Sequence, residues 1–195
     1  MKILSFILLC QLGNPLLACQ DFQKQAHPDN LFPEVVITTS LGDITVELDR
    51  RRAPLTVNAF LHYIDSKSYE KSLVHRVVPD YVVQGGAFTE KMASITSCGK
   101  LFNESGNGLS NKQNTIAMAR HNEPHSAETS FYFNLQDNTN LDPNEKSWGY
   151  TVFGYVIGGQ DILQQISQVK TGTNSELNAK DVPLEPILIQ SVVLQ

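Results

Sequence analysis

The chain has few of the groups on which metal, redox and disulfide-rich proteins depend, with three cysteines, five histidines and one tryptophan in 195 residues. The patterns G-x-S-x-G, H-E-x-x-H and C-x-x-C are absent, which argues against common hydrolase and redox chemistries. His121 and His125 are four residues apart, but Pro124 between them disfavours the helix that would align two ligands. We therefore expect neither a metal site nor a cofactor.

Positive charge is also scarce. Lys and Arg total 15 against 20 Asp and Glu, so the formal net charge is −5. Such a chain lacks the broad basic field that holds a phosphate backbone, and we expect no nucleic-acid partner. The composition, 41% hydrophobic and 18% charged, is that of a globular protein with one compact core.

Long apolar runs are missing outside the N-terminus. The run from Ile3 to Ala18 is too short to cross a bilayer and contains Pro15, so we predict no transmembrane span. Lys2, the apolar segment after it and the small residue Ala18 instead predict a signal peptide over residues 1–18. We expect a periplasmic or otherwise exported protein.

Cys19 has two possible fates. The sequence LLAC over 16–19 resembles the lipobox of bacterial lipoproteins, in which the cysteine is acylated and anchors the chain to a membrane. Ordinary cleavage would instead leave Cys19 able to pair with Cys98 in an oxidising compartment. Both alternatives stay open, and residues 19–34 are predicted to form a polar tether.

Residues 35–195 are predicted to form one mainly β domain. Short β-branched and aromatic runs predict most of its elements as strands, and only two segments have helical spacing. A closed antiparallel barrel is the simplest arrangement, because it leaves no strand edge exposed. The segment 87–114 is a long loop of the kind that often forms a binding surface. The predicted elements are a hairpin over 35–49, helices over 54–65 and 160–169, two strands or one bent strand over 73–78 and 81–84, and strands over 115–119, 131–136, 150–157 and 186–194.

Arg76 is the most unusual polar residue of this domain. Strand alternation would place it on one face with Val74 and Val78, so a permanent charge would lie between two apolar side chains. The arginine could extend to the rim or pair with a carboxylate. Alternatively, it could meet a polar ligand in an otherwise apolar groove.

Five segments of the domain together form a recognisable pattern: VHRVVPDYVVQGGAFTE (74–90), TIAMAR (115–120), SFYFNLQDN (130–138), LD (141–142) and YTVFGYVIGGQDIL (150–163). The first of them, which contains Arg76, closely resembles the signature of the cyclophilins, a family of peptidyl-prolyl cis/trans isomerases. The resemblance runs from about residue 35 to the C-terminus and looks closest to the exported bacterial branch. It implies an eight-stranded antiparallel β-barrel capped by two α-helices, with an outer groove for proline-containing unfolded or extended polypeptides.

The resemblance also implies roles for individual residues. Arg76 would be the catalytic donor, aimed at the prolyl nitrogen. The substrate-binding residues would be Tyr81, Val82, Tyr132 and Leu141 around the proline ring, Gln84, Ala119 and Arg120 along the peptide, and Ser130 and Tyr150 beside them.

Four positions depart from the family pattern. Ser130 replaces a usual glutamine, Asn140 falls where an aromatic residue is common, Tyr150 replaces a histidine and Asp80 replaces a glycine. These departures favour a second interpretation, a chaperone or assembly module that binds proline-containing segments with little turnover. A weaker third is a lipid-anchored scaffold that recruits a partner through the loop 87–114. We expect a monomer.

Overall fold

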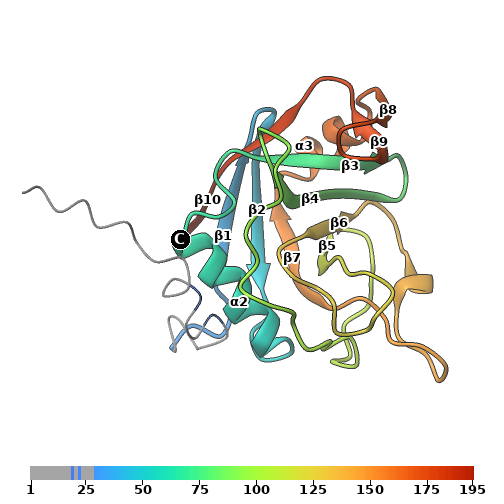
Figure 1. The fold of residues 1–195 in the computed structure, drawn as a ribbon. Helices are drawn as coiled ribbons and strands as arrows, with labels where there is room; N and C mark the ends of the chain where they lie inside the picture. Colours follow the sequence, from blue (N-terminus) through green and yellow to red (C-terminus); the bar gives the residue numbers. More distant parts are fainter. Residues whose placement is uncertain (1–18, 20–21, 23–28) are drawn as a thin grey trace, which may run out of the picture.

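The computed structural model describes Cys19, Phe22 and residues 29–195 (Figure 1). The predicted signal peptide and most of the predicted tether lie outside these residues. The part of the tether nearest the domain is hydrogen-bonded to it. The carbonyl of Pro33 accepts from the amide of Leu48 at 2.9 Å, and the carbonyl of Leu31 accepts from the amide of Arg50 at 3.1 Å.

The described residues form ten strands and two α-helices, and every predicted strand and helix is present. Two strands were not predicted, because β8 and β9 form a hairpin in a segment that none of the predicted helices or strands covers. Within the described ranges, no helix has the length and apolarity needed to cross a membrane. The elements are β1 (Glu34–Thr39), β2 (Gly42–Leu48), α2 (Pro54–Asp65), β3 (Ser72–Val78), β4 (Val82–Thr89), β5 (Thr115–Met118), β6 (Phe131–Asn134), η1 (Thr139–Leu141), β7 (Val152–Gly158), α3 (Gln160–Ser167), β8 (Thr171–Asn174), β9 (Ala179–Pro183) and β10 (Ile187–Leu194).

Eight strands close into the predicted antiparallel barrel, in the order β1-β10-β3-β4-β6-β5-β7-β2. The first and last strands of the chain complete the circle, with Val35 opposite Leu194 and Ile37 opposite Val192. Closure satisfies the backbone groups that an open sheet would leave at its edges.

The two helices cover opposite ends of the barrel (Figure 1). Helix α2 places Phe60 against Phe131 and Phe153, with ring centroids 5.4 and 5.2 Å apart. Helix α3 buries Leu163 and Ile166 in the same core. Both helices thus contribute the apolar face that their spacing predicts.

Strand β3 contains a β-bulge that sets the direction of Arg76. Val74 pairs with Gly85 and Arg76 pairs with Gln84, so His75 is an extra residue between two successive pairs. Val74 is buried in the barrel core, whereas Arg76 lines an outer hollow. The prediction that Val74 and Arg76 share a face is therefore wrong, because the inserted residue reverses the alternation.

Cys19 and Cys98 form a disulfide, with Cα atoms 5.0 Å apart and a sequence separation of 79. The nearby ring of Phe22 packs against His62 and Tyr63 of α2, at 6.3 and 6.4 Å between centroids. Of the two alternatives for Cys19, the structure therefore contains the disulfide with Cys98. The lipid alternative would use the same sulfur atom and cannot coexist with it.

Candidate active site

An outer hollow of about 190 Å³ brings together the predicted site residues. All of the predicted residues except Ser130 line it. They come from strands β3, β4 and β6, from the short helix η1, and from the segments beside β4, β5 and β7. The lining residues are Arg76, Tyr81, Val82, Gln84, Ala119, Arg120, Tyr132, Leu141 and Tyr150.

The floor of this hollow is apolar and rigid. Val82 and Tyr132 are 3% and 4% exposed and pack with Ala117 and Val152 in a small cluster outside the main core. The Tyr132 ring meets Tyr150 edge-on at 5.9 Å between centroids. Burial raises the pKa of Tyr132 well above its ordinary value, so its hydroxyl stays protonated.

Arg76 stands beside this apolar floor and is held from two sides. Its Nη1 donates to Oε1 of Gln84 at 3.5 Å, and its Nε lies 3.7 Å from a carboxylate oxygen of Asp181. Asp181 lies on β9, in the hairpin that the sequence did not predict, so this partner was missed. The pair is about two-fifths exposed, and solvent screens it, so its main effect is on orientation.

Ser130 lies beside Gln84 but does not line this first hollow. Its hydroxyl accepts from Nε2 of Gln84 at 3.3 Å and donates to the carbonyl of Gly85 at 3.1 Å. It lines a second hollow of about 410 Å³, which adjoins the first through Gln84, Ala119 and Arg120. Ser130 therefore holds Gln84 from the side of the second hollow.

Buried His75 also faces the second hollow. It is 7% exposed, and the burial lowers its pKa to about 4, so the ring is neutral at physiological pH. The ring meets Phe88 edge-on at 5.2 Å between centroids. A neutral histidine adds no second charge next to Arg76.

Arg120 forms the wall between the two hollows. Its guanidinium lies 4.5 Å from the centre of the Tyr150 ring. Its nitrogens donate to the carbonyls of His121, Trp148 and Gly149 at 2.8, 2.7 and 3.1 Å. Arg120 thereby joins the segment after β5 to the segment before β7.

A buried polar network supports the hollow from behind. Sequence reasoning missed it, because asparagines in loops are typical of turns. Oδ1 of Asn111 accepts from the Tyr132 hydroxyl at 2.7 Å, and its Nδ2 donates to Asp142 at 2.9 Å. Nδ2 of Asn138 donates to the carbonyl of Tyr81 at 2.9 Å. These side chains fix residues that line the hollow without lining it themselves.

The arrangement suits rotation about an X-Pro bond. That bond resists rotation by about 18–20 kcal/mol because the amide is stabilised by resonance. A donor placed over an apolar pocket can stabilise the twisted state, in which the prolyl nitrogen regains its lone pair. Such a reaction uses neither a nucleophile nor a metal. Among the described residues, no group of three His, Cys, Asp or Glu side chains could hold a metal ion.

Comparisons with known proteins agree with this geometry. Residues 34–194 match the family model for cyclophilin-type peptidyl-prolyl cis-trans isomerases. The chain is 44% identical over 160 residues to the isomerase cyp18 of Streptomyces antibioticus, covering 80% of this chain and 95% of that one. It is 37% identical over 163 residues to isomerase B of Escherichia coli, covering 82% and 98%. A crystal structure of a cyclophilin-type isomerase from Cryptosporidium parvum has the same fold, with a TM-score of 0.69 at 19% identity, covering 84% of this chain and 98% of that one.

The chain therefore belongs to the cyclophilin-type peptidyl-prolyl cis-trans isomerase family. The bacterial relatives are named as isomerases and match this chain over nearly their full length. Peptidyl-prolyl cis-trans isomerisation is accordingly the activity of this chain, and the predicted fold class is confirmed.

Proposed function

We propose that this isomerase acts on proline-containing segments of exported polypeptides, with Arg76 as its catalytic residue. The observation that carries the proposal is the placement of the Arg76 guanidinium beside the apolar hollow that Val82 and Tyr132 floor. The bulge at His75 turns Arg76 outward, and Gln84 and Asp181 hold it there.

In the proposed mechanism the pyrrolidine ring lies over the apolar floor of the first hollow, between Tyr81 and Leu141. We call this first hollow, of about 190 Å³, the proline hollow. The Arg76 guanidinium donates a hydrogen bond to the prolyl nitrogen as the amide twists. This bond is weak in the planar ground state, where the nitrogen lone pair is delocalised, and strong in the twisted state. The site thereby lowers the barrier by binding the transition state more tightly than the substrate.

The proposed location rests on two observations. Residues 1–18 have the composition of a signal peptide, and the Cys19–Cys98 disulfide suits an oxidising compartment such as the periplasm. We propose a monomer that starts at or near Cys19, with the disulfide rather than a lipid on its sulfur. A client that has just crossed a membrane is extended, which is the form the outer groove can bind.

Arg76→Ala tests the catalytic assignment. We expect kcat/KM in a protease-coupled isomerisation assay to fall by about 10² to 10³, the range for loss of one preorganised donor. Arg76→Lys should recover only part of the lost activity, because the lysine ammonium does not reproduce the planar arrangement of donors of a guanidinium. Arg51→Ala is the matched control, since Arg51 lies outside both hollows and stacks on Phe32. Near wild-type activity of Arg76→Ala would refute the assignment.

The same assay decides between the enzyme and the binding module. Turnover by the wild-type chain with tight peptide binding supports the enzyme. Binding without turnover would support a chaperone. That interpretation is considered because Ser130 and Asn140 depart from the family pattern.

Mass spectrometry of the protein from its native cells tests the proposed location. An N-terminus at or near Cys19 supports export, and an intact Met1 would refute it. A diacylglyceryl mass on Cys19 would refute the disulfide form while leaving export in place.

A further inference from the structure

Three aromatic rings form a cluster on the surface next to the site, and neither hollow described above includes them. Phe102 stacks on His125 with 4.6 Å between ring centroids and 13° between planes. The indole of Trp148 meets His125 at 5.1 Å and Phe102 at 6.1 Å, edge-on in both cases. We call Phe102, His125 and Trp148 the aromatic cluster.

The aromatic cluster is unusually open to solvent for rings that pack together. Phe102 is 54% exposed and Trp148 is 44% exposed. Their open faces amount to on the order of 200 Å² of aromatic surface. Contiguous exposed aromatic surface on a folded domain is typical of a contact site for another polypeptide.

The cluster is also held in place, because hydrogen bonds between side chains and the backbone connect the three segments that carry it. Nδ1 of His125 accepts from the amide of Asn103 at 3.0 Å. Nδ2 of Asn103 donates to the carbonyls of Pro124 and Gly149 at 3.0 Å each. A rigid aromatic platform loses little conformational entropy when it binds a partner.

Arg120 connects the cluster to the proline hollow. It lines that hollow and donates to the Trp148 carbonyl at 2.7 Å. Trp148 is two residues from Tyr150, whose ring lines the hollow under Arg120. Cα atoms two residues apart in a chain are separated by at most about 7 Å, so a peptide leaving the hollow reaches the cluster within a few residues.

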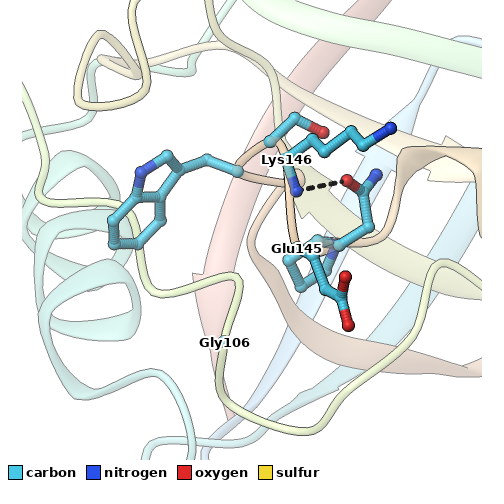
Figure 2. Close-up of a pocket in the computed structure, with 7 residues that line it drawn as sticks. Gly106, Glu145 and Lys146 are labelled. Atoms are coloured by element: carbon cyan, nitrogen blue, oxygen red, sulfur yellow. Dashed lines mark hydrogen bonds between the residues drawn. The ribbon is translucent and has the colours of Figure 1, made fainter.

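The turn that carries Trp148 adds a third surface feature. Residues 143–148 and Gly106 surround a shallow hollow of about 290 Å³, drawn in Figure 2 with Gly106, Glu145 and Lys146 labelled. The Lys146 amide donates to Oδ1 of Asn144 at 2.9 Å, which fixes the turn. Trp148 lines this hollow and also belongs to the aromatic cluster.

We propose that the aromatic cluster is an extension of the substrate groove. It binds an apolar side chain of the same client polypeptide that places its proline over Val82 and Tyr132. The partner is thus an extended, unfolded segment with an aliphatic or aromatic residue within about six positions of a proline, which at 3.3 Å per residue allows roughly 20 Å. The inference rests on the proposed function and adds to it a preference for the sequence around the proline. Phe102 belongs to the loop 87–114, so the inference also names the residue through which that predicted binding surface would contact the client.

The single tryptophan of the chain makes a direct test possible. A series of twelve-residue peptides would carry one central Ala-Pro, a single Leu at successive positions on either side, and Gly or Ser elsewhere. For Leu at the matching position we expect a shift in Trp148 emission and a Kd about five- to tenfold lower than for the all-Gly/Ser peptide.

Phe102→Ser keeps Trp148 as the reporter and should abolish that preference for Leu. Phe102→Leu, which retains an apolar surface, should restore most of it. Phe32→Ser is the matched control, since Phe32 is 39% exposed and lies outside the cluster and the hollows. A four-residue Ala-Pro substrate serves as the internal reference for an intact proline hollow in every variant.

The outcomes separate the two proposals. No turnover of the four-residue substrate by the wild-type chain would overturn the proposed function. Two other outcomes would overturn only the proposed extension of the groove. One is normal turnover with no effect of the Leu position on Kd, and the other is an unchanged preference for Leu in Phe102→Ser. Self-association of the wild type that Phe102→Ser abolishes, measured by sedimentation, would also overturn it by assigning the cluster to a second copy of this chain.

Discussion

Asn111 is predicted to control the shape of the active site without touching the substrate. Its side chain is fully buried and makes hydrogen bonds with both its oxygen and its nitrogen. Oδ1 accepts from the Tyr132 hydroxyl at 2.7 Å and from Asn134 at 3.2 Å, while Nδ2 donates to Asp142 at 2.9 Å. Asp142 follows Leu141 directly, so one amide ties the floor of the hollow to its rim.

The cost of Asn111→Ala follows from the groups that it would leave unpaired. The Tyr132 hydroxyl and an N–H of Asn134 would lose their acceptor in a buried place, at about 1–3 kcal/mol each. Asp142 would lose one donor but keep the Asn111 amide at 2.7 Å and the hydroxyl of Ser110. We therefore expect a loss of about 3–5 kcal/mol in the free energy of unfolding.

Two further variants give the result a specific pattern. Tyr132→Phe removes one donor and leaves Oδ1 of Asn111 bonded to Asn134, so it should cost only about 1 kcal/mol. Asn111→Asp keeps the acceptor for Tyr132 but turns a carboxylate toward Asp142. It should therefore destabilise the fold, because two like charges would lie next to each other in a buried place.

The assay combines urea unfolding, followed by circular dichroism, with kcat/KM at a temperature at which each variant is folded. We expect Asn111→Ala to lower kcat/KM by about tenfold, because Tyr132 and Leu141 lose their fixed positions. In a double-mutant cycle the Asn111 and Tyr132 effects should be non-additive by more than 0.5 kcal/mol. A stability loss below 1 kcal/mol together with unchanged kcat/KM would refute the reasoning.

Two other predictions concern stability. His75 has a pKa of about 4 in the folded state against 6.5 when exposed, so the unfolded state binds more protons as the pH falls below 6.5. Between pH 7 and pH 5 the free energy of unfolding should therefore fall by about 2 kcal/mol. Urea titrations at the two pH values should show a smaller fall in His75→Gln. The Cys19–Cys98 disulfide closes a loop of 79 residues, so reduction by dithiothreitol should lower the free energy of unfolding by up to about 4 kcal/mol. Equal urea midpoints for the reduced and oxidised protein would contradict the second prediction.

The sequence by itself determined most of the fold. Helix α2 has the predicted bounds because Pro54 favours a helix start and the apolar residues after it recur at helical spacing. The strands form where β-branched and aromatic residues follow one another, because such side chains pack well on the partly buried surface of a sheet. Local pattern was therefore sufficient for the type of each of these elements.

Only the tertiary structure decided the details of the site. Alternation placed Arg76 on the face of Val74, but the bulge at His75 separates them, since pairing with β4 rather than local spacing sets the register. The β8–β9 hairpin, which brings Asp181 to Arg76, consists largely of Gly, Asn, Thr and charged residues and has no strand pattern. Pairing between its two strands overrides that weak local preference.

The network of Asn111, Asn138 and Asp142 could not be found from the sequence either, because asparagine and aspartate in loops usually face water. Here the closing of the barrel brings segments that are far apart in sequence into contact, as the separation of 31 residues between Asn111 and Asp142 illustrates. Burial then makes each unpaired polar atom costly, so the side chains have to bond to one another. Sequence pattern determines which segments become strands and helices, whereas contacts between distant segments determine which polar groups meet in the site.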